Sequence, residues 1–374
     1  MIYLDNAATT KVFDCAIDAA IQSMRENYFN PNATYCGGVA VKRNIESHRE
    51  AIAREIGAVG GRLYFTSGAT EANNWAINFG RKNKKGNIVI TAGEHSSVYE
   101  PAMRLKNGGT DVRIAKLSPD GTVDVNDIMR LVDIETALVS VIHTNNETGV
   151  VNPIAKITAD IKSIAPRAFI HSDGVQAVLK TGDTIDGLGV DFYTVGGHKL
   201  GAPKGIGLLY VRNGVNISPM LAGGGQEYAM RSGTQNTPYI AAFAAAVQEF
   251  NRIANRNEIL SLREKLVKIF EDNGCGIIGS GENSGYILCV HIPEVKAEIL
   301  QNLAYDNGVV IGKGAACSGN KRGNRVLEAM GLSRTVAEQC IRISLCAGIS
   351  DREAVEAAHI IVECANSIRS NHIG

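Results

Sequence analysis

Short apolar runs alternate with helical patterns through the first 211 residues, and this alternation constrains the fold more than any other feature of the chain. The apolar runs cover residues 63–66, 87–91, 111–115, 137–143, 168–172, 192–195 and 207–211. The helical patterns between them cover residues 70–82, 97–107, 124–133 and 153–164, and a short helix is expected near 174–180. Strands that alternate with helices predict an α/β fold built on a mainly parallel sheet, here with seven strands.

A different pattern follows a long helix that we expect at about 238–256. It consists of a strand at 287–291, a helix near 295–307, a loop at 312–325, a strand at 341–345 and a closing helix at 351–369. This pattern is typical of a smaller α+β unit. We therefore expect a large domain at residues 15–255 and a small domain made of residues 1–14 and 256–374.

Composition excludes several classes of function. The chain has 38 basic and 38 acidic residues, which argues against a dedicated binder of nucleic acid or of membrane surfaces. It has no apolar run of 18 residues and no leader-like start, so we expect no membrane span and a cytoplasmic protein. The eight cysteines are scattered without a CxxC pair, so we expect reduced thiols and no metal site.

Polar or ionisable residues follow five of the predicted strands. In a parallel sheet the carboxyl ends of the strands meet at one edge, where such folds bind ligands. The segment Ser67-Gly-Ala-Thr-Glu71 opens a helix there, and a helix N-terminus attracts phosphate, although an ordinary N-cap is the plainer alternative. The other residues at this edge are Glu94 and His95, Asn145, Asp173 with Gln176, and His198 with Lys199.

A phosphate cup, a flat side chain, an acid, an amide and a lysine together match pyridoxal phosphate. The aldehyde of this cofactor reacts with a lysine amine, and its ring nitrogen stays protonated beside a carboxylate. A dinucleotide site requires GxGxxG directly after a strand, and no such segment is present. A P-loop requires GxxxxGK[ST], and Gly308-Val-Val-Ile-Gly-Lys-Gly314 has the wrong spacing.

The motifs along the whole chain resemble those of a known family, the cysteine desulfurases of the class V aminotransferases, which are fold type I pyridoxal phosphate enzymes. The segments that carry the resemblance are Tyr3-Leu-Asp-Asn-Ala-Ala-Thr-Thr10, Thr66-Ser-Gly-Ala-Thr-Glu-Ala-Asn-Asn74, Glu94-His95, Asn145-Asn-Glu-Thr-Gly149, Asp173 with Gln176, His198-Lys199, Gly223-Gly-Gly-Gln-Glu227, Arg231-Ser-Gly-Thr234, Gly314-Ala-Ala-Cys317 and Ile341-Arg-Ile-Ser-Leu345.

The resemblance implies a set of residues that bind the cofactor. Lys199 is implied as the lysine that bonds to the aldehyde, Asp173 as the partner of the ring nitrogen, and Gln176 as the donor to the ring's phenolic oxygen. His95 is implied to stack on the ring. The remaining implied contacts are Asn145 to cofactor and substrate, Ala69, Thr70 and His198 to the phosphate, and Thr234 to the phosphate of a neighbouring subunit, which implies a homodimer.

The resemblance also implies the residues that act on the substrate, L-cysteine. Lys199 would remove the Cα proton, His95 would assist proton transfers, and Arg342 would hold the substrate carboxylate. Cys317 would attack the substrate sulfur and become a persulfide, leaving L-alanine. Lys313, Lys321 and Arg322 lie near Cys317 in the sequence and favour its thiolate, whereas a buried structural cysteine is the plainer alternative.

The implied function is therefore transfer of sulfur from L-cysteine to an acceptor protein, for iron–sulfur cluster assembly or thiolation. Two alternatives stay open: a selenocysteine lyase or another pyridoxal phosphate-dependent β-elimination or transamination, and a non-catalytic adaptor of sulfur metabolism. The chain departs from the family pattern at Gly196, where serine is usual, at Tyr35, where histidine is usual, and at Cys346, where glycine is usual.

Overall fold

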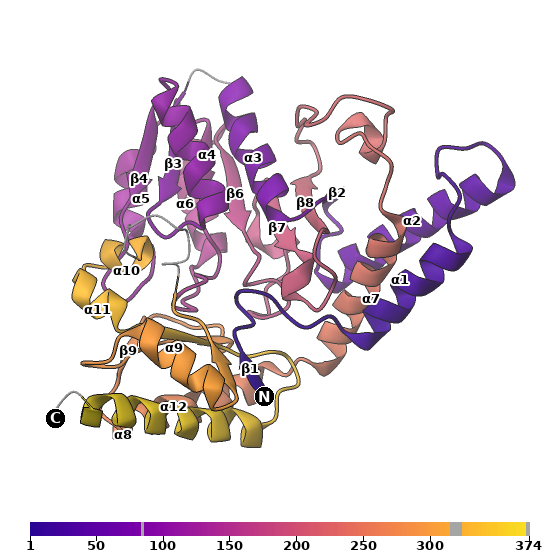
Figure 1. Cartoon of the computed structure of the whole chain (residues 1–374). Coiled ribbons are helices and arrows are strands. Elements are labelled where there is room, and N and C mark those ends of the chain that lie inside the picture. The colour runs from indigo at the N-terminus through magenta and orange to yellow at the C-terminus, as the bar shows by residue number, and fades with distance from the viewer. Residues whose placement is uncertain (84–85, 315–323, 372–374) are drawn as a thin grey trace.

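The computed structural model describes residues 1–83, 86–314 and 324–371. All seven apolar runs form strands of one sheet, in the order β2-β8-β7-β6-β5-β3-β4 (Figure 1). The strands are β2 (Gly61–Thr66), β3 (Ile88–Thr91), β4 (Val112–Ala115), β5 (Leu138–Ser140), β6 (Phe169–Asp173), β7 (Phe192–Gly196) and β8 (Gly207–Arg212). Five of them pair in parallel, and β8 runs antiparallel to both of its neighbours, β2 and β7. The prediction of a mainly parallel seven-stranded sheet is confirmed.

Helices cover both faces of this sheet because its strands are apolar on both sides. Ile88 and Ile90 pack in one cluster with Trp75 and Val98, which belong to α3 (Ala69–Asn83) and α4 (Ser96–Asn107). Val89, between the two isoleucines, packs in the other cluster, which contains α6 (Ile154–Ile164) and α7 (Thr237–Ile253). α5 (Val125–Leu131) contacts β4 and α6. This alternation along β3 follows from the two-residue period of a strand.

Residues 174–180 form successive turns, so the short helix expected there was wrong. The backbone N–H groups of Ala177 and Val178 donate to Gly174 O, but Leu179 adopts φ +61°. An L-residue in this left-handed region cannot continue a right-handed helix. The segment therefore follows Asp173 as a tight turn.

The C-terminal third forms two small sheets beneath the large one (Figure 1). β9 (Gly276–Ile278), β10 (Ile287–His291) and β12 (Cys340–Ser344) pair antiparallel, and β11 (Val309–Ile311) pairs in parallel with β1 (Ile2–Leu4). The N-terminal strand thus joins strands from the other end of the chain. The helices of this region are α8 (Arg256–Asp272), α9 (Ala297–Asp306), α10 (Arg325–Ala329), α11 (Arg334–Glu338) and α12 (Asp351–Asn371). The domain boundaries at residues 15 and 255 stay a prediction.

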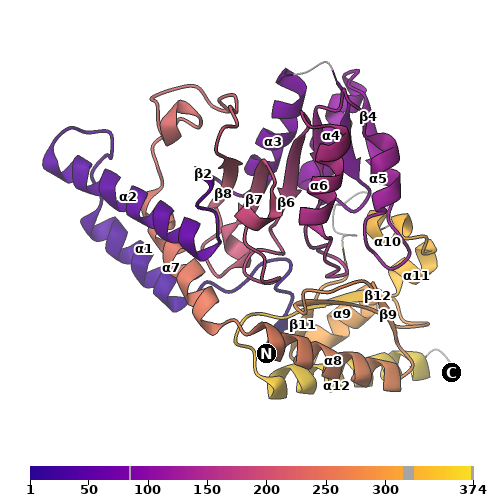
Figure 2. The same ribbon diagram turned by 180° about the vertical axis from the view of Figure 1, so that it is seen from behind.

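Helices α1 (Asp14–Glu26) and α2 (Cys36–Glu55) both pack against α7, and together these helices extend to one side of the sheet (Figure 2). The sequence analysis did not predict α1 and α2. Within the described residues, no helix combines the length and the apolar character that crossing a membrane requires.

Candidate active site

The site lies at the edge of the sheet where the parallel strands end, and the N-terminal segment crosses it. Lys199 ends the short 3₁₀ helix Gly197–Lys199, directly after β7. Its Nζ donates to Ala7 O and, at 2.6 Å, to Ala8 O. Gln176 Nε2 also donates to Ala7 O, at 3.0 Å. Lys199 and Gln176 are therefore neighbours that share one carbonyl acceptor.

Asp173 ends β6, and only 3% of its surface is exposed. Its Oδ1 accepts from the Val175 N–H at 3.0 Å, and its Oδ2 accepts from Asn73 Nδ2 at 2.8 Å. Within the described part of the chain, no basic side chain forms an ion pair with this carboxylate. A buried carboxylate without a cationic partner is costly unless a bound cation completes the site.

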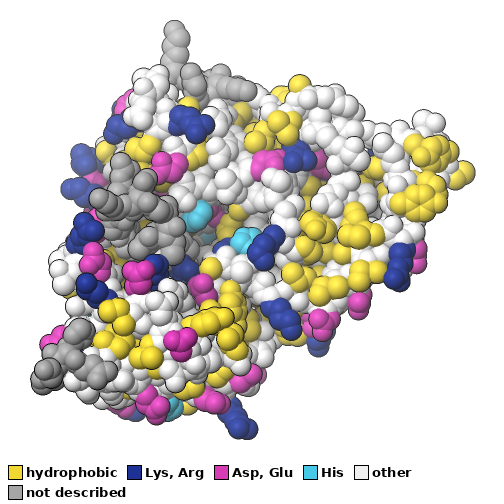
Figure 3. Space-filling model, in the orientation of Figure 1, with side chains coloured by type: hydrophobic (Ala, Val, Ile, Leu, Met, Phe, Trp, Pro, Cys, Tyr) yellow, Lys and Arg dark blue, Asp and Glu magenta, His cyan; other side chains and the backbone are white. Residues whose placement is uncertain are grey.

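A chain of hydrogen bonds links Asp173 to His95. Asn73 Nδ2 donates to Asp173 Oδ2 and to Ser97 Oγ, at 2.8 Å each. His95 caps α4, and its Nδ1 accepts from the Ser97 N–H at 3.1 Å. Since Nδ1 accepts this bond, the neutral imidazole carries its proton on Nε2. The ring is exposed at the opening of the site, where Figure 3 shows histidine side chains in a hollow of this face.

Sequence reasoning missed Asn73 and Ser97. Asn73 is fully buried on α3, one helical turn after the Ala69-Thr70 segment that the resemblance singled out. Ser97 lies two residues after His95. For Asn73 the sequence offered a signal, because Asn73 lies three residues after Thr70 and residues three or four apart share one helix face. These two residues connect the acid to the imidazole.

Burial and neighbouring charges lower the pKa values of the lysine and the two histidines of the site. Burial, with the charge of Arg342, lowers the pKa of Lys199 to about 8, although Asp5, Asp173 and Glu147 oppose the shift. Burial also lowers the pKa of His95, against the opposing effect of Asp173. For His198, burial with Lys199, Lys204 and Lys180 lowers the pKa to about 4. Lys199 therefore offers a free amine near neutral pH.

Arg342 lies on β12, facing the same edge. Its Nη1 donates to Glu147 Oε1 at 3.1 Å and to Asn146 O at 3.0 Å, and its Nη2 donates to Asp5 Oδ1 at 3.1 Å. Its buried Nε has no hydrogen-bond partner in the described part of the chain. Burial works against the charge, but Glu147 and Asp5 outweigh it and raise the pKa of Arg342. A substrate carboxylate would thus meet a guanidinium already held in place by two acids.

Asn145 and Glu94 also reach this edge, and hydrogen bonds within the fold hold Asn145 at both ends of its amide and Glu94 at one carboxylate oxygen. Asn145 Oδ1 accepts from the N–H groups of Glu147 and Thr148, and its Nδ2 donates to Gly93 O at 3.2 Å. Glu94 Oε1 accepts from Thr91 and from the Ile142 N–H. Burial and the nearby Asp173 raise the pKa of Glu94 to about 8, so it is mostly protonated at neutral pH.

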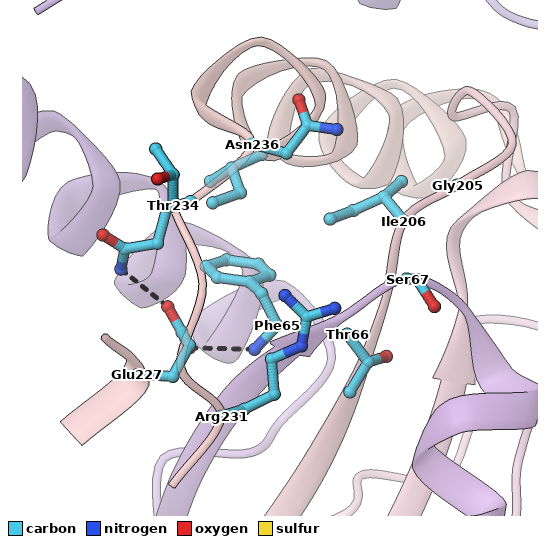
Figure 4. A pocket seen from close by; sticks show the side chains of 11 residues that line it. Phe65, Thr66, Ser67, Gly205, Ile206, Glu227, Arg231, Thr234 and Asn236 are labelled. Carbon is cyan, nitrogen blue, oxygen red and sulfur yellow. Dashed lines mark hydrogen bonds between the residues drawn. The ribbon is translucent and has the colours of Figure 1, made fainter. Parts of the chain in front are cut away.

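The predicted phosphate contacts lie at the start of α3. Ala69 is half-buried and begins the helix, Thr70 is exposed beside it, and His198 Nδ1 lies 3.2 Å from Thr9 Oγ1. Thr234 lies on the other side of this turn, in a cavity of about 210 Å³ that Thr66, Ser67 and Arg231 also line (Figure 4). Neither Lys199 nor Asp173 lines this cavity. Cys317 lies outside the described residues.

Gly174, directly after Asp173, is required for close packing. A Cβ at this position would lie 1.9 Å from Tyr193 Cζ, and Tyr193 is buried with its hydroxyl 2.8 Å from His143 Nδ1. We expect Gly174→Ala to displace Asp173 or Tyr193, to destabilise the protein by about 1–3 kcal/mol and to weaken cofactor binding. Thermal unfolding of the apoprotein and titration with pyridoxal phosphate measure the two effects.

Gly196→Ala is the matched control for this variant. It adds the same methyl group at the end of β7, where the nearest atoms to a new Cβ are Val175 Cγ1 at 3.4 Å and Ala69 Cβ at 3.5 Å. Its backbone, at φ −109° and ψ 115°, suits any residue. Equal effects of the two alanine variants would contradict the packing argument.

Comparison with known proteins gives a consistent result over the full length. The model of the family "Aminotransferase class-V" matches residues 2–357. The cysteine desulfurase of Nostoc sp. is 33% identical over 99% of this chain and 94% of its own length, and the cysteine desulfurase IscS of Methanosarcina thermophila is 30% identical over 99% and 93%. A solved structure titled NifS-like protein superposes with a TM-score of 0.90 at 33% identity and covers 98% of this chain and 99% of that one.

Proposed function

Because the chain belongs to the aminotransferase class-V family, we propose that it is a pyridoxal phosphate-dependent cysteine desulfurase, which converts L-cysteine to L-alanine and passes the sulfur on. The similarity to named cysteine desulfurases spans almost the whole chain, and it does not favour selenocysteine lyase, elimination or transamination. The observation in this chain that carries the proposal is the buried Asp173 carboxylate, without a basic partner, in the cluster of the Lys199 amine.

The residues present fit the cofactor. Within the described residues, no basic side chain forms an ion pair with Asp173, and the protonated ring nitrogen would supply the missing cation. The N-terminus of α3, a helix of 15 residues, supplies free N–H groups for a phosphate. Lys199, whose pKa is about 8, offers an amine for the aldehyde, and His95 offers a flat ring. Each chemical part of the cofactor therefore has a complementary group at this edge.

Pyridoxal phosphate supplies an aldehyde that captures the substrate amine and a cationic ring that withdraws electrons from the substrate Cα. Lys199, once free, takes the Cα proton as a base. His95 carries its proton on Nε2 and passes protons at the opening of the site. Arg342 holds the substrate carboxylate beside Asp5 and Glu147.

Cys317 carries the sulfur in this proposal. Its thiolate attacks the substrate sulfur, so an S–S bond forms while the substrate's C–S bond breaks. The electron pair of the broken bond stays on the organic fragment, which takes up a proton and leaves as L-alanine. The persulfide on Cys317 then passes its outer sulfur to an acceptor protein, and we place this chemistry in the cytoplasm, where thiols stay reduced.

Gly196 is a position at which we expect a substitution to strengthen cofactor binding. The serine usual in the family would bring a hydroxyl to the end of β7, and the space around a new Cβ accepts it. We expect Gly196→Ser to bind pyridoxal phosphate roughly threefold to tenfold more tightly, because a hydrogen bond to a charged group adds stability. Titration of the apoprotein measures this, and Gly196→Ala separates the hydroxyl from the added methyl group. A serine variant that binds no better than the alanine variant would contradict the expectation.

We further propose that the protein is a homodimer. Apolar side chains stand exposed on one face of α1: Ile17 at 41%, Ile21 at 41% and Met24 at 54%. Residues spaced this way form a stripe along a helix, and exposed apolar stripes favour association. Thr234 lines a cavity that Lys199 and Asp173 do not line, and the resemblance assigns it to the phosphate of a neighbouring subunit. Light scattering is expected to give twice the chain mass of 39.9 kDa, and a monomer would refute the dimer.

The proposed activity is tested with the purified protein, pyridoxal phosphate and L-cysteine under a thiol reductant. Equal amounts of L-alanine and sulfide are expected. Selenocysteine and L-serine, supplied in parallel, separate a desulfurase from a selenocysteine lyase or a general elimination enzyme. Pyruvate and ammonia as products, or no turnover of cysteine, would refute the proposal.

A further inference from the structure

We propose that Lys180 is a positioning residue for the cofactor, since its buried ammonium orients the Gln176 amide and places a positive charge behind it. The inference rests on the proposed function, because Gln176 is the residue expected to reach the cofactor's phenolic oxygen. Lys180 has no part in the reaction proposed above, where its charge enters only as one of the causes that lower the pKa of His198.

The hydrogen bonds of Gln176 determine which way its amide faces. Lys180 Nζ lies 3.1 Å from Gln176 Oε1, and Gln176 Nε2 lies 3.0 Å from Ala7 O. A lysine ammonium can only donate and a backbone carbonyl can only accept, so the oxygen must face Lys180 and the nitrogen must face the site. Both side chains are buried, at 6% exposed for Lys180 and 4% for Gln176. The second N–H of Nε2 thereby stays available for an acceptor in the site.

Burial of the charged Lys180 side chain at this position is energetically unfavourable. Within the described chain, its Nζ has Gln176 as its one hydrogen-bond partner, and the ring of Tyr286 lies 5.6 Å away. Burial, with the charge of Lys199, lowers the pKa of Lys180 to about 7, and no acidic side chain is among the groups that act on it. In the unloaded site about half of the Lys180 side chains are therefore charged at pH 7, and an anion nearby would favour the charged form.

The Gln176 amide connects Lys180 to the position where such an anion would bind. Lys180 polarises the amide through Oε1, and the polarised N–H at the other end of the amide donates more strongly. An ionised phenolic oxygen beside Nε2 would therefore be stabilised by a charge that never touches it. Loss of that charge would make the bound cofactor hold its proton to a higher pH.

The experiment is a pH titration of the visible absorption of the cofactor-loaded Lys180→Met variant. Methionine keeps the length of the side chain and removes the charge. The midpoint of the absorption change is expected to rise by about one pH unit relative to the wild type. Titration of apoprotein with pyridoxal phosphate is expected to show weaker binding by the same variant. Lys180→Gln serves the same comparison where the methionine variant does not fold.

Two controls separate this role from a structural one. Lys156→Met removes an exposed charge from α6 and should leave the midpoint unchanged. In a Gln176→Ala background, adding Lys180→Met should shift the midpoint by less than a third of its effect in the wild type, because the connecting amide is gone. An unchanged midpoint in Lys180→Met, or a full shift in the Gln176→Ala background, overturns the inference. Absence of a cofactor band in the wild type would instead refute the proposed function.

Discussion

Replacing Lys199 with alanine is expected to lower kcat/KM for L-cysteine by roughly 10²–10⁴-fold or more, the range that general acid–base catalysis supplies. The variant should also lose the covalent link to the cofactor. Borohydride reduction followed by mass measurement of the Lys199 peptide detects that link in the wild type. Absorbance of the loaded proteins compares the two forms directly.

The structure explains why the effect should be large. Lys199 Nζ lies just after the end of β7, and among the described residues it donates to backbone carbonyls of the N-terminal segment and to no carboxylate. These bonds can be released without leaving a buried charge unpaired. Burial and Arg342 lower its pKa to about 8, so an appreciable part of the amine is neutral at physiological pH. Uptake of pyridoxal phosphate by the apoprotein should therefore speed up with pH and level off above about 8.

Lys204→Ala is the matched control for this prediction. Lys204 is exposed and lies five residues after Lys199 in the sequence. Its removal should leave the covalent link and the turnover close to those of the wild type. A Lys199→Ala variant that keeps turnover within tenfold of the wild type would contradict the assigned role. A cofactor uptake rate that does not change between pH 6 and pH 9 would contradict the lowered pKa.

Local patterns in the sequence were sufficient to predict the sheet. Each predicted apolar run became a strand, because short runs bounded by helices favour a fully buried parallel sheet. The pairing of β1 with β11 joins residues 2–4 to residues 309–311, and neither three-residue strand has a periodicity of its own. The turn at 174–180 was misread because its apolar content resembles a helix, whereas Leu179 is left-handed. Tertiary contacts determine both features.

The residues of the candidate site also fall into two groups, those that the sequence could predict and those that depend on tertiary contacts. Residues directly after strands, such as Asp173 and Lys199, could be placed from sequence because parallel strand ends converge. The partners that hold them could not. Asn73 reaches Asp173 from a helix 100 positions earlier in the chain, and Asp5 reaches Arg342 across 337 positions. Such contacts join distant parts of the closed fold. Helix spacing can indicate that Asn73 shares a face with Thr70, but it does not reveal that Asn73 reaches Asp173.

Replacing Cys317 with alanine is expected to lower sulfur transfer from L-cysteine by at least about a thousandfold, the scale on which turnover falls when a nucleophile is lost. The variant should still bind the cofactor and keep its absorption band. Both results follow if Cys317 acts on the substrate sulfur and takes no part in holding the cofactor. Mass measurement of the Cys317 peptide after exposure to L-cysteine should show one added sulfur atom in the wild type.

Five of the other seven cysteines are poor candidates for this nucleophile. Burial raises the thiol pKa of Cys15, Cys275, Cys346 and Cys364, and a hydrogen bond with Cys340 raises that of Cys289. A raised pKa leaves less thiolate, which is the reactive form. Cys36 is exposed at the start of α2, so Cys36→Ala is the matched control.

The pair of variants distinguishes transfer through a protein thiol from direct release of sulfide. A Cys36→Ala variant should transfer sulfur as the wild type does, and Cys317→Ala should not. Should both Cys317→Ala and Cys36→Ala keep full transfer, neither of these thiols carries the sulfur. In that case the persulfide on residue 317 is refuted, while the roles of Lys199 and Asp173 stand on their own test.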